Sequence, residues 1–403
     1  MDIQYNSDQQ DLLKAAYEWW NYDKYNPLFQ YAGSGGTGKS FMLHAIINMI
    51  GIPMEKIAPA AYTGAASIVL RTKGFPQAKT EHAWLYTPVD IALRDKQGNL
   101  LMNDIFDVPM TGMGFVPKPM EGIELMIIDE APMTPLSIRQ EIEKRNVRVI
   151  ACGDLKQLPP VESTPGYLVD GKIHKLNQIM RQAENNPIVM LSNRAYKGLP
   201  IHKGYYGSPY GSVLVIEEDE LTDNMIAWSD IMICGTNRTR DMMNKRVREN
   251  ILGIKSDLPQ FGERLVCRKS NWNKEVDGIS LANGLVGIIT SYPDVSNFDG
   301  KTFSIDFTPL ILNKPFHGLR CNYEYLISEY DKRKLIKNNK YAVGEKMEYA
   351  YCITTHVSQG SEYANGIYFK EYLSKEINNN LDYTGISRFR NSCIIVLPKR
   401  KFY

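Results

Sequence analysis

The stretch YAGSGGTGKS, residues 31–40, decides the fold of this chain. It follows the apolar residues Leu28 and Phe29, and after it the apolar positions of residues 41–50 repeat with helical spacing. Residues 33–40 match G-x-x-x-x-G-K-[ST] in full, which is the pattern of a phosphate-binding loop. A glycine-rich turn that arose by chance would lack this setting between a strand and a helix N-terminus. The sequence therefore predicts an α/β domain that binds the phosphates of a nucleotide.

The residues of this loop have different roles in holding a nucleotide. Its glycines let backbone N–H groups converge on the phosphates, Lys39 reaches the β- and γ-phosphates, and the Ser40 hydroxyl enters the Mg²⁺ shell. We therefore predict ATP and Mg²⁺ as cofactors. The predicted nucleotide contacts in the loop are Gly33, Ser34, Gly35, Gly36, Thr37, Gly38, Lys39 and Ser40.

Two further apolar runs end in polar residues suited to phosphoryl transfer. The run LMIIDEAPM ends in Asp129, which suits the metal shell, and Glu130, which suits polarising the attacking water. Acidic pairs at strand ends are often only solvated, but this pair follows a phosphate loop. The run GDLKQLPPV places Gln157 where its amide can hydrogen-bond both a γ-phosphate and the attacking water. The sequence thus predicts Lys39, Glu130 and Gln157 as catalytic residues and Ser40 and Asp129 as metal ligands.

Composition places the chain among globular proteins and limits the type of partner. Its 403 residues are 43% hydrophobic and 23% charged, which allows two or three domains with buried cores. The net charge is only +2, so any nucleic-acid surface must be a local basic track.

Cysteine spacing and hydropathy bear on the cellular compartment. The six cysteines are at least 31 positions apart, as between Cys321 and Cys352, which excludes local C-x-x-C pairs and favours buried, reduced thiols. The N-terminus lacks the apolar core of a secretory signal, and no apolar run approaches the roughly 20 residues that span a bilayer. We expect a cytoplasmic protein, in the host cytoplasm if a phage encodes it, with no membrane partner.

Alternating apolar runs and helical patterns indicate an α/β chain with parallel sheets covered on both faces. We expect a first domain over residues 1–180, interrupted at 87–119 by a hairpin and loop. A second α/β unit over 181–403 is interrupted at about 263–340 by a small all-β insertion. The segment KGYYGSPYGS (203–212) is expected to be an exposed loop, with an aromatic surface for stacking bases as the alternative.

The ordered set of motifs resembles superfamily 1 helicases, specifically the 5′-to-3′ RecD-like and Dda-like branch, nearly from end to end. This resemblance implies two RecA-like P-loop NTPase domains, a strand-separating pin at 87–119 and an SH3-like β-barrel at about 263–340. Gln359-Gly360-Ser361-Glu362 resembles the Q-G-x-E of this branch, whereas UvrD-like 3′-to-5′ members usually carry K-G-L-E. The stretches that carry the resemblance are YNSDQ, APAAYTGAA, TEHAWLY, DEAPM, GDLKQLPPV, LNQIMRQAENNPIV, GTNRTRDMMN, LANGLVGII, TTHVSQGSEY and YTGISRFR.

The resemblance also implies roles for single residues. Gln9 would recognise adenine, and Gly360 and Glu362 would lie at the nucleotide. Arg181 and Arg388 would be catalytic arginines, since guanidinium groups at the γ-phosphate stabilise transition-state charge. Taken singly, either arginine could equally be a surface ion pair. The implied DNA contacts are Thr63, Gly64, His82, Trp84, Tyr86, Asn237, Thr355 and His356, of which Trp84 and Tyr86 are just as well explained as core residues.

The resemblance implies an ATP-dependent DNA helicase that moves 5′ to 3′ on single-stranded DNA and parts duplex. Its expected partners are single-stranded DNA, single/double-strand junctions, and replication or recombination proteins. An RNA-directed Upf-like helicase and an ATP-gated single-strand clamp without processive unwinding remain alternatives. Two positions depart from the family pattern: Val357 stands where many relatives have Lys, and Pro132 replaces the Ser common in DE-x-S-M. With Val357 the chain lacks a lysine that could contact a DNA phosphate. With Pro132 it lacks a hydroxyl that could link the ATP site to neighbouring segments.

Overall fold

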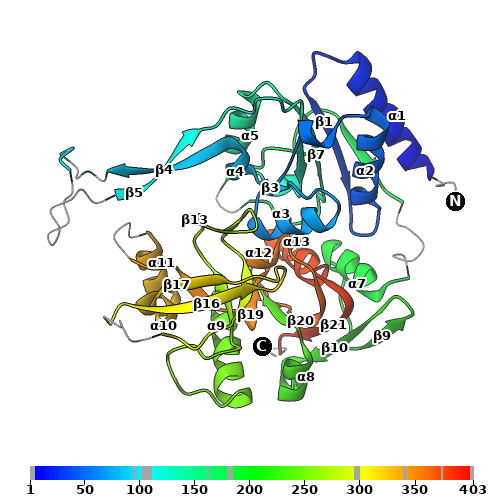
Figure 1. Cartoon of the computed structure of the whole chain (residues 1–403). Coiled ribbons are helices and arrows are strands. Elements are labelled where there is room, and N and C mark those ends of the chain that lie inside the picture. The colour runs from blue at the N-terminus through cyan, green and yellow to red at the C-terminus, as the bar shows by residue number, and fades with distance from the viewer. Residues whose placement is uncertain are drawn as a thin grey trace.

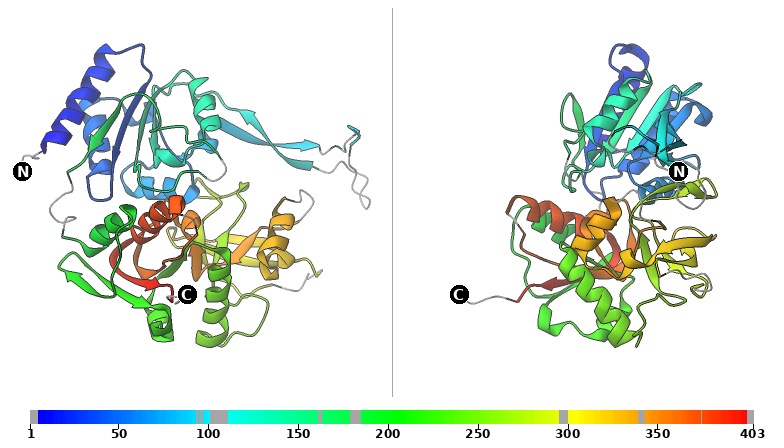
Figure 2. Two further views of the ribbon diagram at one scale, coloured as in Figure 1. Left: turned by 180° about the vertical axis from the view of Figure 1, so that it is seen from behind. Right: turned by 90° about the vertical axis from the view of Figure 1, so that its left-hand side faces the viewer.

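The chain folds into two α/β lobes, one above the other in Figure 1, and Figure 2 shows both lobes from behind and from the side. The computed structural model describes residues 5–92, 94, 97–100, 111–160, 163–178, 185–294, 300–338, 343–373 and 375–399. Each lobe is built around its own parallel sheet, and an antiparallel insertion extends from the second lobe. This arrangement confirms the predicted class of two RecA-like units with parallel sheets.

The sheet of the first lobe is six-stranded and fully parallel, in the order β3-β2-β6-β7-β1-β8. Its strands are β1 (Leu28–Gly33), β2 (Ile57–Ala61), β3 (Lys79–Thr80), β6 (Leu125–Asp129), β7 (Arg148–Gly153) and β8 (Ile173–Leu176). In register, Asp129 pairs with Ala61, and Ala32 with Gly153. The carboxyl ends of β1, β6 and β7 therefore lie at one edge, where ligands of parallel α/β sheets bind.

Short helices and turns connect these strands. They are α1 (Ser7–Tyr22), α2 (Lys39–Ile50), η1 (Met54–Lys56), α3 (Gly64–Thr72), α4 (Glu81–Leu85), η2 (Ala131–Met133) and α5 (Leu136–Glu143). The core of α1 and α2 against the sheet is apolar, with Leu12, Leu43 and Ile46 at most 2% exposed. Burial of such side chains supplies roughly 1.5–3 kcal/mol each, which fixes α2 and its N-terminus on the sheet.

An antiparallel pair, β4 (Tyr86–Ala92) and β5 (Thr111–Pro117), projects from the side of the first lobe (Figure 1). Tyr86 pairs with Pro117 at its base and Ala92 with Thr111 farther out. A hairpin thus lies within residues 87–119, but the expectation of a loop in the Pro/Gly/Met-rich part is wrong for residues 111–117, which form its second strand. Residues 101–110 of that segment lie outside the described part of the chain.

The sheet of the second lobe has the order β19-β11-β20-β21-β10-β9, parallel except for β9. Its strands are β9 (Gly204–Ser208), β10 (Gly211–Glu217), β11 (Ile231–Cys234), β19 (Cys352–Thr354), β20 (Tyr363–Phe369) and β21 (Phe389–Leu397). The expectation of an exposed loop at 203–212 is wrong, because Tyr205 and Tyr206 pair with β10 as an edge strand. The intervening helices are α7 (Pro187–Tyr196), η3 (Glu218–Glu220), α8 (Asp223–Trp228), α9 (Asn237–Arg246), the π-helical turn η4 (Val247–Ile251), α12 (Thr355–Ser358) and α13 (Lys375–Ile386).

The insertion contains a five-stranded antiparallel sheet, β17-β16-β15-β12-β18, and a separate hairpin, β13-β14. Its elements are β12 (Arg264–Cys267), β13 (Asn271–Val276), β14 (Ile279–Leu281), β15 (Val286–Ile289), β16 (Thr302–Pro309), β17 (Phe316–Asn322), α10 (Tyr323–Ile327), α11 (Tyr330–Asn338) and β18 (Met347–Tyr349). A bridge between Cys321 and Glu345 joins β17 to the residues before β18, so the sheet curves back on itself. The SH3-like description remains a prediction.

The predicted domain limits also remain predictions, because the boundary at 180/181 falls among residues 179–184, which the structure does not describe. In the described parts of the chain, no helix has the length and apolar character needed to cross a bilayer. All six cysteines are buried and free, as expected for reduced thiols.

Candidate functional site

The glycine loop joins the end of β1 to the start of α2, as the sequence predicts. Gly38 caps α2 with a φ of 85°, a left-handed conformation that a side chain would strain. Thr37 stabilises the turn, since its Oγ1 donates to the Ser34 carbonyl at 2.9 Å. Lys39 Nζ lies 3.4 Å from the same carbonyl oxygen. The loop therefore has a fixed backbone with its lysine folded along it, at a helix N-terminus that favours anions.

Gln9 lies beside this loop although it belongs to α1. Its Oε1 accepts a hydrogen bond from the Asn6 backbone N–H at 3.1 Å, and the Asn6 side chain caps the Gln9 N–H in return. Its Nε2 is 3.2 Å from the point that a Cβ on Gly38 would occupy. The helix cap therefore holds the predicted adenine-binding amide against the loop.

The acidic pair follows β6 at the same edge of the sheet. Asp129 ends the strand, and Glu130 adopts a left-handed φ of 52°, with its N–H donating to Asp129 Oδ1 at 3.0 Å. Burial raises the pKa of Glu130, and Asp129 raises it further. The positive charges of Arg388, Lys39 and Lys73 oppose this shift. The acidic pair, the loop lysine and an arginine of the second lobe therefore share one electrostatic environment.

Lys73 is a member of this group that the sequence analysis missed. It follows the last residue of α3, and its Nζ lies 3.5 Å from Asp129 Oδ2. Burial alone would lower its pKa, but Asp129, Glu130 and Glu362 together raise it. No motif contains Lys73; it is the C-cap residue of α3, and only the packing of that helix brings it to the acidic pair.

Helix α13 of the second lobe binds the glycine loop and the GDLKQLPPV segment directly. The Tyr383 hydroxyl accepts from the Gly35 N–H at 3.2 Å and donates to Asp154 Oδ2 at 2.5 Å. Leu158 N–H donates to Thr384 Oγ1 at 3.0 Å. We call these contacts, with that of Asn380 to Lys156, the nucleotide seam.

Gln157 and Arg388 both lie in the nucleotide seam. Gln157 is 7% exposed, and its Oε1 is buried without a hydrogen-bond partner in the described structure. Arg388 is 6% exposed, with its Nε donating to the Thr384 carbonyl at 3.2 Å. Its charge acts on Glu130 of the other lobe, so the ion-pair alternative on an outer surface does not apply to it. Arg181 lies outside the described residues.

Two residues of the QGSE segment lie near different parts of the first lobe. Glu362 is exposed and acts electrostatically on Lys73 at the acidic pair. A Cβ on Gly360 would lie 2.5 Å from Ala66 Cβ and 2.9 Å from Thr63 Oγ1, so Gly360 packs on the start of α3. Its predicted nucleotide contact remains a prediction.

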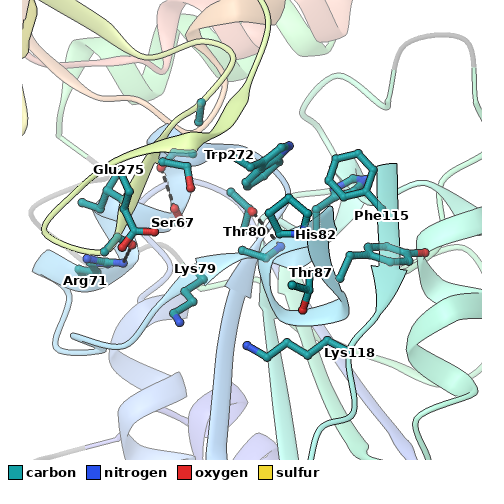
Figure 3. Close-up of a pocket in the computed structure, with 18 residues that line it drawn as sticks. Ser67, Arg71, Lys79, Thr80, His82, Thr87, Phe115, Lys118, Trp272 and Glu275 are labelled. Carbon is teal, nitrogen blue, oxygen red and sulfur yellow. Dashed lines mark hydrogen bonds between the residues drawn. The ribbon is translucent and has the colours of Figure 1, made fainter. Parts of the chain in front are cut away.

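A second site is a cavity of about 220 Å³ between the first lobe and the β13-β14 hairpin (Figure 3). The Trp272 ring lies 6.3 Å from that of His82 and 6.5 Å from that of Phe115. Three basic residues line the cavity against one acid; they are Arg71, Lys79 and Lys118, with Glu275 opposing. Burial and the like charge of Lys118 lower the pKa of Lys79. Such crowding of cations indicates a site for an anion.

The lobes touch closely beside this cavity. A Cβ on Gly64 would lie only 2.2 Å from Ala282 Cβ, so only glycine allows this approach. The Arg71 guanidinium donates hydrogen bonds to the carbonyls of Asp277 at 3.0 Å and Gly278 at 2.7 Å. These two hydrogen bonds hold the turn of the β13-β14 hairpin. We call these contacts the pocket seam.

The structure brings three predicted DNA contacts, Gly64, His82 and Tyr86, into this cavity. Burial lowers the pKa of His82, so its ring is neutral at physiological pH. Trp84 instead packs against the core of the lobe, with its indole N–H donating to the Pro59 carbonyl at 2.8 Å. Thr63 caps α3 by accepting the Ala66 N–H.

The predicted contacts of the second lobe are not among the residues that line the cavity. The Thr355 hydroxyl is buried and donates to the Cys234 carbonyl at 3.1 Å, and His356, whose pKa burial lowers, follows it in α12. Asn237 begins α9 and accepts from the Arg240 guanidinium at 2.8 Å. Their predicted DNA contacts remain predictions.

Comparison with known proteins places this geometry in context. Residues 4–201 match the AAA domain family. A structure of two coordinating Pif1 helicases at forked double-stranded DNA has a TM-score of 0.53 and 19% identity, covering 98% of this chain and 92% of that chain. Bacteroides Pif1 with ADP-AlF3 and single-stranded DNA has a TM-score of 0.52 and 17% identity, with the same coverage of both chains. Bacteroides Pif1 bound to single-stranded DNA has a TM-score of 0.51 and 17% identity, again with that coverage.

At these identities the Pif1 structures show a common fold over the whole length of the chain. The AAA domain match covers the lobe that contains the glycine loop and the acidic pair. The family match and the shared two-lobed fold agree with the resemblance of the ordered motifs to superfamily 1 helicases.

Proposed function

We propose that this protein is an ATP-dependent DNA helicase that translocates 5′ to 3′ on single-stranded DNA and unwinds duplex ahead of it. The observation that carries the proposal is the hydrogen bond of Tyr383 with the Gly35 N–H, because it joins α13, which Arg388 follows, to the glycine loop of the other lobe. The Pif1 structures bound to ADP-AlF3, single-stranded DNA and forked DNA support a common activity. The RecD-like direction rests on the sequence of the QGSE segment.

The residues at the loop suit Mg²⁺ and ATP. The N–H groups of the loop and the Lys39 ammonium would hold the phosphates, and Gln9 would contact the base. Ser40 and Asp129 would ligate Mg²⁺, which usually takes one or two protein oxygens and completes its shell with phosphates and water. Bound Mg²⁺ would neutralise charge on the phosphates. The buried, unpartnered Oε1 of Gln157 supports this fit, since it can accept a hydrogen bond from water at the γ-phosphate.

Catalysis would depend on closure of the nucleotide seam. Glu130 would accept a proton from the attacking water, while Arg388 would reach the γ-phosphate from the second lobe. We propose the same role for Arg181. Because opposite lobes supply these groups, ATP would draw the lobes together and hydrolysis would release them. Such closure can move the DNA-contacting segments of one lobe relative to the other.

The cavity beside the pocket seam would hold part of the single strand. Its lysines, Lys79 and Lys118, match phosphates, and Trp272, His82 and Phe115 offer ring faces to bases. This mode reads no sequence, as a motor that passes over all bases requires. The β4-β5 hairpin would act as the strand-separating pin, because it projects from the lobe beside this cavity.

The central test measures steady-state ATP turnover with and without oligonucleotide, together with unwinding of duplexes with a 5′ or a 3′ tail. We expect stimulation by single-stranded DNA and unwinding only from the 5′ tail. Lys39→Ala should abolish turnover, and Glu130→Gln should bind ATP but hydrolyse it slowly. Normal unwinding by either variant would refute the assignment. Stronger stimulation by RNA would favour an RNA-directed motor, and DNA binding without turnover would favour a clamp.

A further inference from the structure

Glu81 is a buried acid that the proposed chemistry does not use. It begins α4, between Thr80 and His82, and its side chain is fully buried. The Thr134 hydroxyl, also fully buried, donates to Glu81 Oε1 at 2.6 Å. These two residues are 53 positions apart in the sequence, so the fold alone brings them together.

The surroundings of Glu81 keep its side chain uncharged. Its Oε2 is buried and has no hydrogen-bond partner in the described structure, and the same holds for the nearby Tyr167 hydroxyl. Burial raises the pKa of Glu81 to about 8, although the Thr134 hydrogen bond opposes the shift. The first lobe therefore favours the neutral acid, which keeps one short hydrogen bond.

The two ends of this hydrogen bond belong to different sites. On one side, Glu81 directly precedes His82, which lines the cavity. On the other, Thr134 follows the η2 turn that begins at Glu130, and its N–H donates to the Ala131 carbonyl at 3.1 Å. The bond therefore connects the segment at the cavity to the segment that bears the proposed catalytic acid.

Pro132, within the same turn, has no hydroxyl. Thr134 supplies a hydroxyl two residues later, at the other end of the same turn.

We propose that Glu81 and Thr134 are positioning residues, whose hydrogen bond fixes the DNA-contacting start of α4 relative to the catalytic turn after Glu130. The inference rests on the proposed function. Without the bond, DNA in the cavity no longer sets the position of Glu130, and stimulation of ATP turnover by DNA falls. Coupling through such residues typically accounts for factors of roughly 2 to 30.

The test compares ATP turnover with and without single-stranded DNA in full-length variants. Thr134→Val keeps the shape but removes the donor, and we expect it to lower the stimulation ratio by roughly 2- to 30-fold. Thr134→Ser and Glu81→Gln keep a donor and an acceptor, respectively, and should retain most of the stimulation. Ser192→Ala is the control, since it removes another buried hydroxyl, bonded within its own helix at Val189, and should have no effect.

Glu81→Met removes the acceptor of the same hydrogen bond. It replaces Thr134→Val in the test if that variant does not fold. We expect the Glu81→Met, Thr134→Val double variant to lose no more stimulation than either single variant, because both remove one interaction. Unchanged stimulation in the folded single variants, or fully additive losses, would overturn the inference. A parent protein that DNA does not stimulate would instead refute the proposed function.

Discussion

The lobes of this protein meet along two seams that are built in different ways. In the nucleotide seam, side chains of α13 such as Tyr383 and Thr384 hydrogen-bond to the backbone of the first lobe. In the pocket seam, backbones approach each other directly at Gly64 and Ala282, and Arg71 holds two carbonyls of the β13-β14 turn. The nucleotide seam therefore depends mainly on hydrogen bonds of side-chain hydroxyl groups, whereas the pocket seam depends on close packing together with the hydrogen bonds of one arginine.

This difference separates two tasks. Hydrogen bonds and charges that depend on side-chain orientation can change when a nucleotide binds, which suits a site that must open and close. A contact as close as that of Gly64 with the Ala282 methyl group resists such changes and can keep a strand enclosed. The helix α3 connects the two, since it begins with Gly64 at the pocket seam and is followed by Lys73 at the acidic pair.

The largest effect should come from the nucleotide seam. Arg388→Ala removes the guanidinium that acts on Glu130, and we expect DNA-stimulated ATP turnover to fall by about 10³-fold or more. Arg388→Lys should recover little, because an ammonium lacks the planar fork of donors. Arg390, exposed two positions later, is the matched control, and Arg390→Ala should leave turnover within about twofold of the parent. Equal turnover of the Arg388 and Arg390 variants would show that the nucleotide seam has no catalytic part.

The pocket seam should respond to a single methyl group. Gly64→Ala places a Cβ 2.2 Å from Ala282 Cβ, so the start of α3 and the insertion must move apart. Overpacking of this kind costs about 1–3 kcal/mol, and we expect the DNA concentration for half-maximal stimulation to rise roughly tenfold. Ala282→Gly in the same chain removes the opposing methyl group and should restore the parent value. A double variant as weak as Gly64→Ala alone would contradict a packed seam.

A third effect concerns stability, at the hydrogen bond that lies between the two seams. The pKa of Glu81 rises from an ordinary 4.5 to about 8 in the folded protein, so the folded state binds the proton more tightly than the unfolded state. The free energy of unfolding should therefore fall as the pH rises through this range, by up to about 1.4 kcal/mol per pH unit. Glu81→Gln should remove this part of the dependence.

Urea unfolding at a series of pH values measures this difference. The gap in free energy of unfolding between Glu81→Gln and the parent should move in favour of the variant as the pH rises. Glu121→Gln, at an exposed position, is the control and should follow the parent. Parallel pH curves for Glu81→Gln and the parent would show that Glu81 is ionised in the fold.

The two seams also differ in how far the sequence could predict them. The glycine loop, Asp129 and Gln157 can be predicted because phosphate chemistry requires certain residue types at strand ends, whereas Arg388 follows only from the resemblance of YTGISRFR to a family motif. Trp272 and Lys73 were not found, since only the folding of distant segments places them at their sites. The same applies at β9, where residues 204–208 pair with β10 and only Pro209 and Tyr210 form the turn between the two strands.

The smallest expected effect sharpens the role of α3. Lys73 Nζ lies 3.5 Å from Asp129 Oδ2, so its ammonium competes with Mg²⁺ for the same carboxylate. Lys73→Met removes this competitor, and we expect the Mg²⁺ concentration for half-maximal turnover to fall roughly fivefold, as for a partly exposed ion pair worth about 1 kcal/mol. Lys73→Arg retains the charge and should behave as the parent. A higher Mg²⁺ requirement in Lys73→Met would contradict this prediction. It would mean that Lys73 orients the acidic pair for the metal and does not compete with Mg²⁺ for the carboxylate.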